Sequence, residues 1–366
     1  MEMPLRGFNN CPIAGANEII ARAGNMRDRL RYVKIPLTAA YTPQERVPGK
    51  WRPCTVETAP DFTATGYFFA ELLSDVLDVP VGIVDCTWGG TRVEGWTNRE
   101  ILETYPDIDL TETGIEATTH WLRPMVMYNA MLHPVAGYTV RGFLWYQGES
   151  NTGDYAMRYG DELKAMIELW RGKWHQPDMP FLIVQLPKFG IDAIEDGGWP
   201  LIREQEWRVA DELEHVAAVV TLDAGESNDL HPHDKKTIAD RAFNVAMDFV
   251  YGQQAQPQPV VETAEADDGL LRMHCVWRNS MGEQMQSQNR HLMTLDGDVP
   301  REIDFLWHDC ATSVRAEAWL DGCDIVARIP SRMPDEVRYA WSNSPESGLI
   351  CDGDGVLLPP FHLPLP

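Results

Sequence analysis

The residues best suited to chemistry lie in the segment DLHP, where an aspartate stands two positions before a histidine. An imidazole titrates near neutral pH and a nearby carboxylate can fix its tautomer, so His231 and Asp229 have the parts of a general base. The alternative is structural, with Asp229 capping the next helix and His231 packing beside it. His231, His233 and Asp234 are also ligand-type side chains, but no comparable ligand motif accompanies them, and we expect no metal or other cofactor.

Two further clusters have groups that stabilise negative charge. Gly89 and Gly90 directly follow an apolar run, and paired glycines leave backbone N–H groups open to a ligand, as an oxyanion hole requires. Gln147, in the segment QGES, adds a side-chain amide, and Glu149 adds a second acid. A glycine pair is more often only a turn, and polar residues also cap strands, so a structural interpretation stays open beside the functional one.

These clusters are predicted to lie at strand ends. Four short apolar runs end near polar or glycine-containing segments and are predicted to form parallel strands: residues 80–88, 140–146, 180–186 and 217–223. In open α/β sheets, ligands bind at the carboxyl ends of the strands. The polar residues that follow the runs are therefore candidates for one shared site.

Helical periodicity fills the segments between the runs. Apolar residues recur at spacings of three and four within residues 155–174, namely Leu163, Met166, Ile167, Trp170 and Trp174. This spacing predicts a helix with one face on the sheet. The same pattern predicts helices at 64–77 and 235–251. Strands alternating with helices imply right-handed crossovers and a three-layer α/β domain.

The sequence changes character after Gly252. Residues 253–259 are rich in Gln and Pro and are followed by a polar stretch, which predicts a linker or a domain edge. From residue 270 onward, short alternating segments separated by turn residues predict a small antiparallel β module. We therefore divide the chain into an α/β domain, residues 1–252, and a linker with a β-rich module, residues 253–366.

Composition restricts the partners. Asp and Glu number 55 against 31 Lys and Arg, a formal charge of −24, so nucleic acid and anionic membrane surfaces would be repelled. No stretch approaches the roughly 20 apolar residues of a membrane span, and the first residues lack the regions of a signal peptide. The seven cysteines form no CxxC pair that would indicate zinc or redox chemistry. A small or carbohydrate partner fits best, while compartment and oligomeric state stay open.

Seven segments, in order over nearly the whole chain, resemble one family. They are FTATGYFFAELL, VGIVDCTWGGTRVEGWTNREIL, MYNAMLHPVAGYTVRGFLWYQGESN, PFLIVQLPKF, REQEWRVAD, DLHPHDKK and VRYAWSNSP. The set is similar to the sialate O-acetylesterase-like branch of the SGNH hydrolases, which is related to the acetyl xylan esterases. The resemblance implies a flavodoxin-like α/β fold and hydrolysis of O-acetyl esters on sugars through a serine acyl-enzyme. It makes His231 the base, Asp229 or Glu149 its acid, and the glycine pair with Gln147 the oxyanion donors.

Arg92 departs from the family, in which proline is frequent at this position of the GGTP motif. It could reach a carboxylate or hydroxyl of a substrate, although a solvated arginine on a loop is the simpler interpretation. Trp88, Trp96, Trp121 and Trp145 offer apolar faces on which a sugar could stack, but we expect most of them to lie in the core.

The nucleophile of the family stands in a GQSNM motif after the first strand. This chain begins MEMP, which commonly follows GQSN in the family, so Met1 matches the methionine of that motif. The resemblance therefore implies a truncation, with the serine two residues before Met1 and the sheet lacking its first strand. Ser150 and Ser227 are the nearest serines in the chain, but neither stands in a nucleophile-elbow pattern.

Two functions follow from these residues. The first is a carbohydrate esterase with a Ser-His-Asp type mechanism, whose nucleophile is missing from this chain, so that this chain by itself would be inactive. The alternative is a non-catalytic carbohydrate-binding relative or an inactive fragment.

Overall fold

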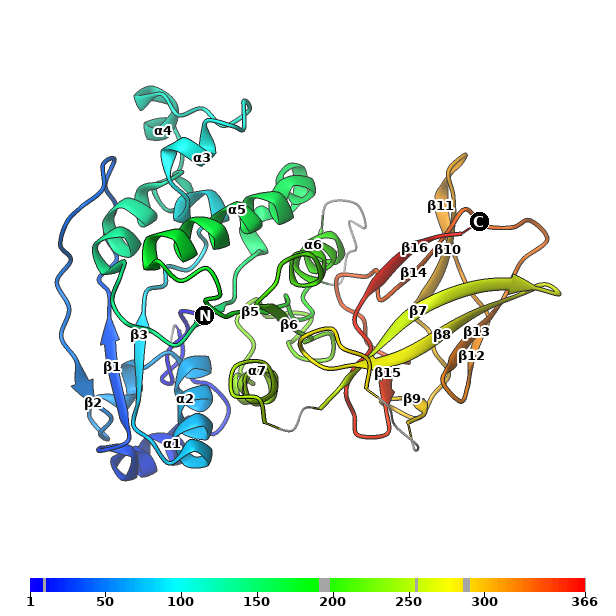
Figure 1. Cartoon of the computed structure of the whole chain (residues 1–366), viewed down its shortest axis with the longest axis horizontal. Coiled ribbons are helices and arrows are strands. Elements are labelled where there is room, and N and C mark those ends of the chain that lie inside the picture. Colours follow the sequence, from blue (N-terminus) through cyan, green and yellow to red (C-terminus); the bar gives the residue numbers. More distant parts are fainter. Residues whose placement is uncertain (9–10, 191–197, 254–255, 286–289, 366) are drawn as a thin grey trace. The chain divides into compact units, whose positions relative to one another are not determined.

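A computed structural model describes residues 1–8, 11–190, 198–253, 256–285 and 290–365 (Figure 1). The chain forms two compact units. Unit 1 comprises Met1–Val184 and His231–Phe243, and unit 2 comprises Gln185–Leu230 and Asn244–Pro366. The two compact units are divided at residues other than 252. The domain boundary predicted after residue 252 stays a prediction.

Unit 1 contains two groups of paired strands. In the first, β1 (Leu30–Lys34) pairs antiparallel with β2 (Arg52–Pro53) and parallel with β3 (Val81–Asp85), and Figure 1 shows β1 and β3 as neighbouring arrows. In the second, β4 (Phe143–Trp145) pairs parallel with β5 (Phe181–Val184). Strands predicted at 80–88, 140–146 and 180–186 are thus confirmed, with shorter bounds. The sequence analysis missed β1, whose short run LRYVK mixes charged and apolar residues.

The predicted helices are also confirmed, the last of them divided between the two units. They are α2 (Ala64–Leu77), α5 (Ala156–Trp174) and α7 (Lys236–Phe249). The five apolar residues that predicted α5 are all buried, because their spacing places them on one face. Shorter helices are α1 (Ala16–Arg22), α3 (Arg99–Leu102) and α4 (Glu112–Ala117).

Unit 2 begins at the residue after β5. Gln185 donates its N–H to the carbonyl of Val219, the last residue of β6 (Val216–Val219), at 3.1 Å. This confirms the fourth predicted strand. Helix α6 (Trp199–Glu212) precedes β6 and carries Arg203, whose side chain is completely buried.

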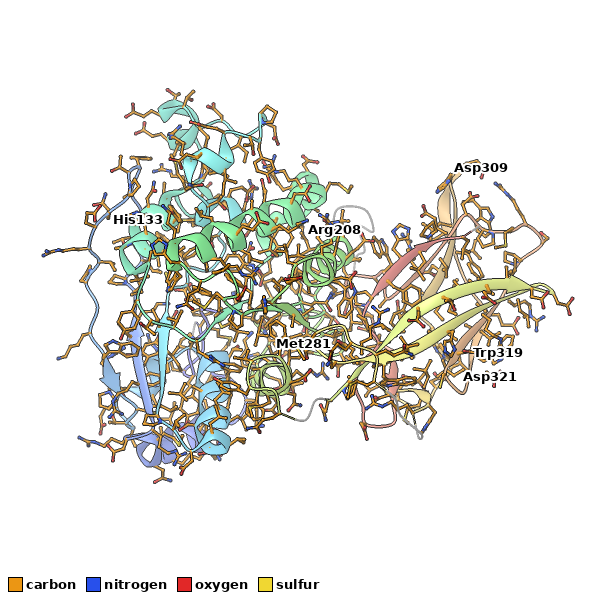
Figure 2. The ribbon with its side chains drawn as sticks, viewed as in Figure 1. His133, Arg208, Met281, Asp309, Trp319 and Asp321 are labelled. Carbon is orange, nitrogen blue, oxygen red and sulfur yellow. The ribbon has the colours of Figure 1, made fainter. Side chains whose placement is uncertain are left out.

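The remainder of unit 2 is antiparallel, as predicted from residue 270 onward. One sheet has the order β12 (Ala318–Asp321), β13 (Asp324–Arg328), β8 (Leu270–Arg278), β7 (Gln258–Asp267). Another has the order β11 (Cys310–Arg315), β10 (Ile303–Trp307), β14 (Glu336–Tyr339), β16 (Phe361–Pro364), and β15 (Ile350–Asp352) pairs with β9 (Leu292–Thr294). The labelled Trp319 stands on β12, with the guanidinium of Arg328 6.0 Å from its ring centroid (Figure 2).

One part of this region differs in structure from what a linker would show. Residues 258–267, in the stretch predicted to be a linker or a domain edge, form strand β7. Its burial is low and irregular, so no clear alternation of apolar and polar residues signals a strand. β7 lies at the edge of its sheet, where Pro259 is tolerated because an edge strand has unpaired backbone groups.

Within the described ranges, no helix combines the length and the apolar character needed to cross a membrane.

Candidate active site

The turn after β3 presents a backbone donor to a negatively charged oxygen. The N–H of Gly89 donates a hydrogen bond to the carboxylate of Glu2. The other oxygen of that carboxylate lies 3.7 Å from the Nζ of Lys34. Gly90, the next residue, has a φ of 76°, a left-handed conformation that glycine adopts without strain. The predicted glycine donor therefore faces a place where an anionic oxygen is bound.

A buried acid closes β3 beside this turn. Asp85 is 3% exposed, and its Oδ1 accepts hydrogen bonds from Lys34 at 3.1 Å and from Thr87 at 2.6 Å. Its Oδ2 accepts a bond from the hydroxyl of Tyr32, and burial together with this carboxylate raises the pKa of Tyr32. The sequence analysis missed Asp85 as a site residue, although an acid that ends an apolar run was a visible signal.

The loop after β4 is tied to the glycine turn. Gln147 donates from Nε2 to the carbonyl of Thr91 at 2.9 Å and to the Oδ1 of Asn151 at 2.8 Å. The hydroxyl of Ser150 donates to the carbonyl of Gly90 at 2.8 Å. Both Nε2 hydrogens of Gln147 are thus engaged, so its role as an oxyanion donor stays a prediction that requires one of these bonds to open.

Arg92 joins the same two loops. Its Nε donates to the carbonyl of Ser150 at 2.9 Å, and its guanidinium lies 3.8 Å from the ring centroid of Tyr155. A guanidinium that is stacked and hydrogen-bonded in this way holds the loops in register. The sequence analysis preferred a solvated arginine for Arg92, and its role in substrate binding stays a prediction.

Asn151 connects these two loops to buried charged side chains. Its side chain is fully buried, its Oδ1 also accepts the N–H of Val93 at 3.0 Å, and its Nδ2 donates to Glu94 at 2.9 Å. Glu94 in turn lies 3.2 Å from Arg158, which also pairs with Glu162 at 2.9 Å. The sequence offered Asn151 only as the last letter of QGESN, without a sign of its partners.

Glu149 and Lys235 lie around the first residue of the chain. Burial, and then the charge of Lys235, lower the pKa of the Met1 amino group to about 6, while Glu149 and Asp85 act in the opposite direction. Lys235 is buried, with its Nζ 5.5 Å from the ring centroid of Tyr146. Residue 1 therefore lies among the charged groups that surround the glycine turn.

His231 is an exposed residue of unit 1, and its ring meets the ring of Phe8 edge-on, with centroids 5.2 Å apart. Asp229 belongs to unit 2, where its N–H donates to the carbonyl of Glu226 at 3.1 Å. The pairing of Asp229 with His231 stays a prediction.

The alternative that Asp229 caps the next helix also stays a prediction. Asp234 holds the first turn of α7, because its carboxylate accepts the N–H of Thr237 at 3.0 Å and the hydroxyl of Thr237 at 2.6 Å.

A glycine turn at the end of a parallel strand, with an amide that binds an anionic oxygen, is a feature of α/β ester hydrolases. The family model described as carbohydrate esterase, sialic acid-specific acetylesterase matches residues 43–241, more than half of the 366 residues. The chain belongs to this family.

Named relatives agree with the family. Mouse sialate O-acetylesterase is 30% identical over 332 residues, which cover 77% of this chain and 59% of the mouse protein. The human sialate O-acetylesterase is 29% identical over 234 residues, covering 58% and 44% of the two chains. The chain thus spans about half the length of these relatives. The crystal structure of a carbohydrate acetylesterase from Xanthomonas citri is similar with a TM-score of 0.84 and 29% identity, covering 99% of this chain and 78% of that one.

Proposed function

We propose that the protein is a carbohydrate O-acetylesterase with a serine, histidine and acid mechanism. The observation that carries the proposal is the hydrogen bond from the Gly89 N–H to the Glu2 carboxylate. An amide that binds one anionic oxygen has the orientation needed to stabilise the oxyanion of a tetrahedral intermediate. During turnover the acetyl oxygen would replace the Glu2 carboxylate at this position.

In the proposed reaction, a serine Oγ attacks the acetyl carbonyl carbon while His231 accepts the hydroxyl proton. Collapse of the intermediate expels the sugar oxygen, which takes the proton from His231. A water molecule then attacks the acetyl-enzyme by the same route, and acetate and the free serine are released. Asp229 or Glu149 would orient the imidazole and stabilise its charged form.

The serine is proposed to precede Met1 by two residues, as in the GQSNM motif. The position of the Met1 amino group, near Lys235, Glu149 and Asp85, supports this. Two residues span at most about 7 Å, so a serine at that distance would remain beside the glycine turn.

An SGNH layout is part of the same proposal. β3 ends the order β2-β1-β3, and β4 stands at an edge of its own sheet. Ile83, Val84 and Leu144 on these two strands are only half-buried, which is unusual for strands of a parallel sheet. One additional strand between β3 and β4, leading into Met1, would join the two groups of strands and cover these side chains.

The test is a chain extended upstream so that GQSN precedes Met1. We expect it to release acetate from 4-nitrophenyl acetate and from an O-acetylated sugar. His231→Ala should lower kcat by about 100-fold or more, as loss of a general base does, whereas His291→Ala, at an exposed histidine of unit 2, should not. An unchanged rate in His231→Ala would contradict the mechanism.

A second candidate is a carbohydrate-binding protein without turnover. It is favoured by the engagement of Gln147, the predicted side-chain oxyanion donor, whose Nε2 bonds to Thr91 and Asn151. Saturable binding of an acetylated sugar by the extended chain, without acetate release, would select this candidate.

A further inference from the structure

We propose that Trp121, with His120 and Trp88, forms a sugar-binding subsite in which the indole of Trp121 stacks on the pyranose ring that carries the acetyl ester. The proposal rests on the esterase function proposed above and adds where the sugar lies. It assigns Trp121 a role in substrate specificity and none in the chemical steps.

Exposure separates Trp121 from the other tryptophans that were considered for stacking. Trp96 and Trp145 are 3% and 8% exposed and pack edge to face, with centroids 6.3 Å apart. Trp121 is 45% exposed, and Trp88 is half-buried. Trp96 and Trp145 therefore belong to the core, and Trp121 presents a large apolar surface to solvent.

The exposed indole lies directly against the predicted oxyanion turn. A Cβ placed on Gly90 would stand 3.3 Å from the Cδ1 of Trp121 and 3.5 Å from its Nε1. Gly90 follows Gly89, whose N–H is the proposed oxyanion donor. A sugar on this indole would therefore hold its ester beside the amide that must bind the acetyl oxygen.

Two more rings extend the surface along the same turn. His120 meets Trp88 with centroids 4.8 Å apart and an angle of 72°, and it meets Trp121 with centroids 6.4 Å apart. His120 thus joins the exposed indole to Trp88, the residue before Gly89. The C–H face of a pyranose is apolar and matches a surface of this kind, while its hydroxyls stay available for hydrogen bonds.

The loop that carries Trp121 is held in place. The N–H of Leu122 donates to the carbonyl of Thr119 at 2.8 Å. Arg123 donates to the carbonyls of Thr118 at 3.1 Å and Glu116 at 3.2 Å, and to the hydroxyl of Tyr41 at 3.0 Å. A fixed platform loses little conformational entropy when a ligand binds, which favours binding by a single exposed ring.

The indole also has a polar group for a sugar hydroxyl. The residues that the structure describes give the Nε1–H of Trp121 no acceptor. Stacking needs no charge, so the subsite should accept an uncharged pyranose. An O-acetylated methyl xylopyranoside is therefore a suitable substrate, and methyl xylopyranoside a suitable ligand.

The experiment compares Trp121→Ala and Trp121→Phe with Trp51→Ala in the extended chain. Trp51 is a matched control, because it is 38% exposed and packs on Gly82, away from the glycine turn. We expect Trp121→Ala to raise KM for the acetylated xylopyranoside about tenfold, with kcat/KM for ethyl acetate unchanged, because that ester has no ring to stack on the indole. Trp121→Phe should recover part of the loss, and Trp51→Ala should behave as the unsubstituted protein.

An unchanged KM for the sugar ester in Trp121→Ala overturns the subsite, and so does an equal loss toward both esters. If the unsubstituted protein hydrolyses neither ester, the esterase proposal fails, and binding of methyl xylopyranoside measured by saturation-transfer NMR still decides the subsite. Binding lost in Trp121→Ala and kept in Trp51→Ala supports it. Equal binding by both variants, or no binding by the unsubstituted protein, overturns it.

Discussion

The guanidinium of Arg203 donates a hydrogen bond to the backbone carbonyl of Asn343 at 3.0 Å, inside unit 2. It also donates to the carbonyls of Ser342 at 2.8 Å and Leu186 at 2.7 Å, so one side chain of α6 joins the segment after Gln185 to a loop of the β-rich region. Arg203 is completely buried, and burial lowers its pKa to about 10, so it remains charged at neutral pH.

We predict that Arg203→Ala lowers the free energy of unfolding by about 3–5 kcal/mol, because three carbonyl groups lose a charged donor that is completely buried. Urea denaturation would measure the change. Arg208→Ala, at a half-buried arginine of the same helix with an exposed ion pair to Glu212 at 3.4 Å and a hydrogen bond to Gln205 at 2.7 Å, should cost about 1 kcal/mol. Equal effects of the two substitutions would contradict this account.

Asn151 should be a second sensitive position. Asn151→Ala removes the acceptor of Val93 and Gln147 and the donor to Glu94, all of which are buried. We expect a loss of about 2–4 kcal/mol in stability and a lower kcat in the extended chain, because the loops of Gly89 and Gln147 would no longer be tied. Thermal unfolding and acetate release would check both effects. Gln176→Ala, at an exposed amide after α5, serves as the control.

Glu162 should make stability depend on pH. One guanidinium, that of Arg158, pairs with Glu162, Glu94 and Asp107. Burial, and next the charge of Glu94, raise the pKa of Glu162 to about 8. In the unfolded chain this carboxyl has the usual glutamate pKa of about 4.3. Between the pKa of the unfolded state and that of the folded state, the folded protein therefore holds a proton that the unfolded chain has lost.

Stability should therefore fall as the pH rises across this window. Glu162→Gln removes the titration. We therefore expect the free energy of unfolding of this variant, relative to that of the unsubstituted protein, to increase from pH 5 to pH 8. Denaturation at several pH values would show it. A constant difference between the two proteins over this range would mean that Glu162 ionises normally.

Glu336 should make the stability of unit 2 depend on pH through its two histidine partners. Its two oxygens accept hydrogen bonds from His308 at 2.8 Å and from His362 at 2.6 Å. The bond to Glu336 raises the pKa of His308, a bond to Glu204 and the bond to Glu336 raise the pKa of His362, and the two histidines lower the pKa of Glu336.

Histidines with a raised pKa stabilise the folded state at acidic pH, and this stabilisation is lost as the pH rises through their pKa in the folded state. At still lower pH, protonation of the Glu336 carboxylate removes the same stabilisation. Glu336→Gln should thus destabilise unit 2 near pH 6 and have little effect near pH 9. Glu265→Gln, at an exposed position of β7, should have no effect at either pH. Destabilisation by Glu336→Gln that is equal at both pH values would exclude titration of the histidines as the cause.

Much of the local structure could be predicted because it depends on neighbours in the sequence. The spacing of Leu163, Met166 and Trp170 predicts α5, and the run PFLIVQL predicts β5, since burial of one helix face or of a whole strand leaves a regular pattern. β7 left no such pattern because it is an edge strand that is only partly buried. β1 left none because Arg31 and Lys34 interrupt its buried apolar residues. The motif order was enough to indicate the family.

The sequence by itself thus determined the α/β character of the first part, the antiparallel second part, the family and the glycine turn of the site. Only the tertiary structure decided that the Gly89 amide binds Glu2, 87 residues away, that Asn151 joins loops 58 residues apart, and that Trp121 is exposed while Trp96 is buried. The reason is physical. Periodicity reports which face of an element is buried, whereas the partners of loop residues depend on how distant segments pack together.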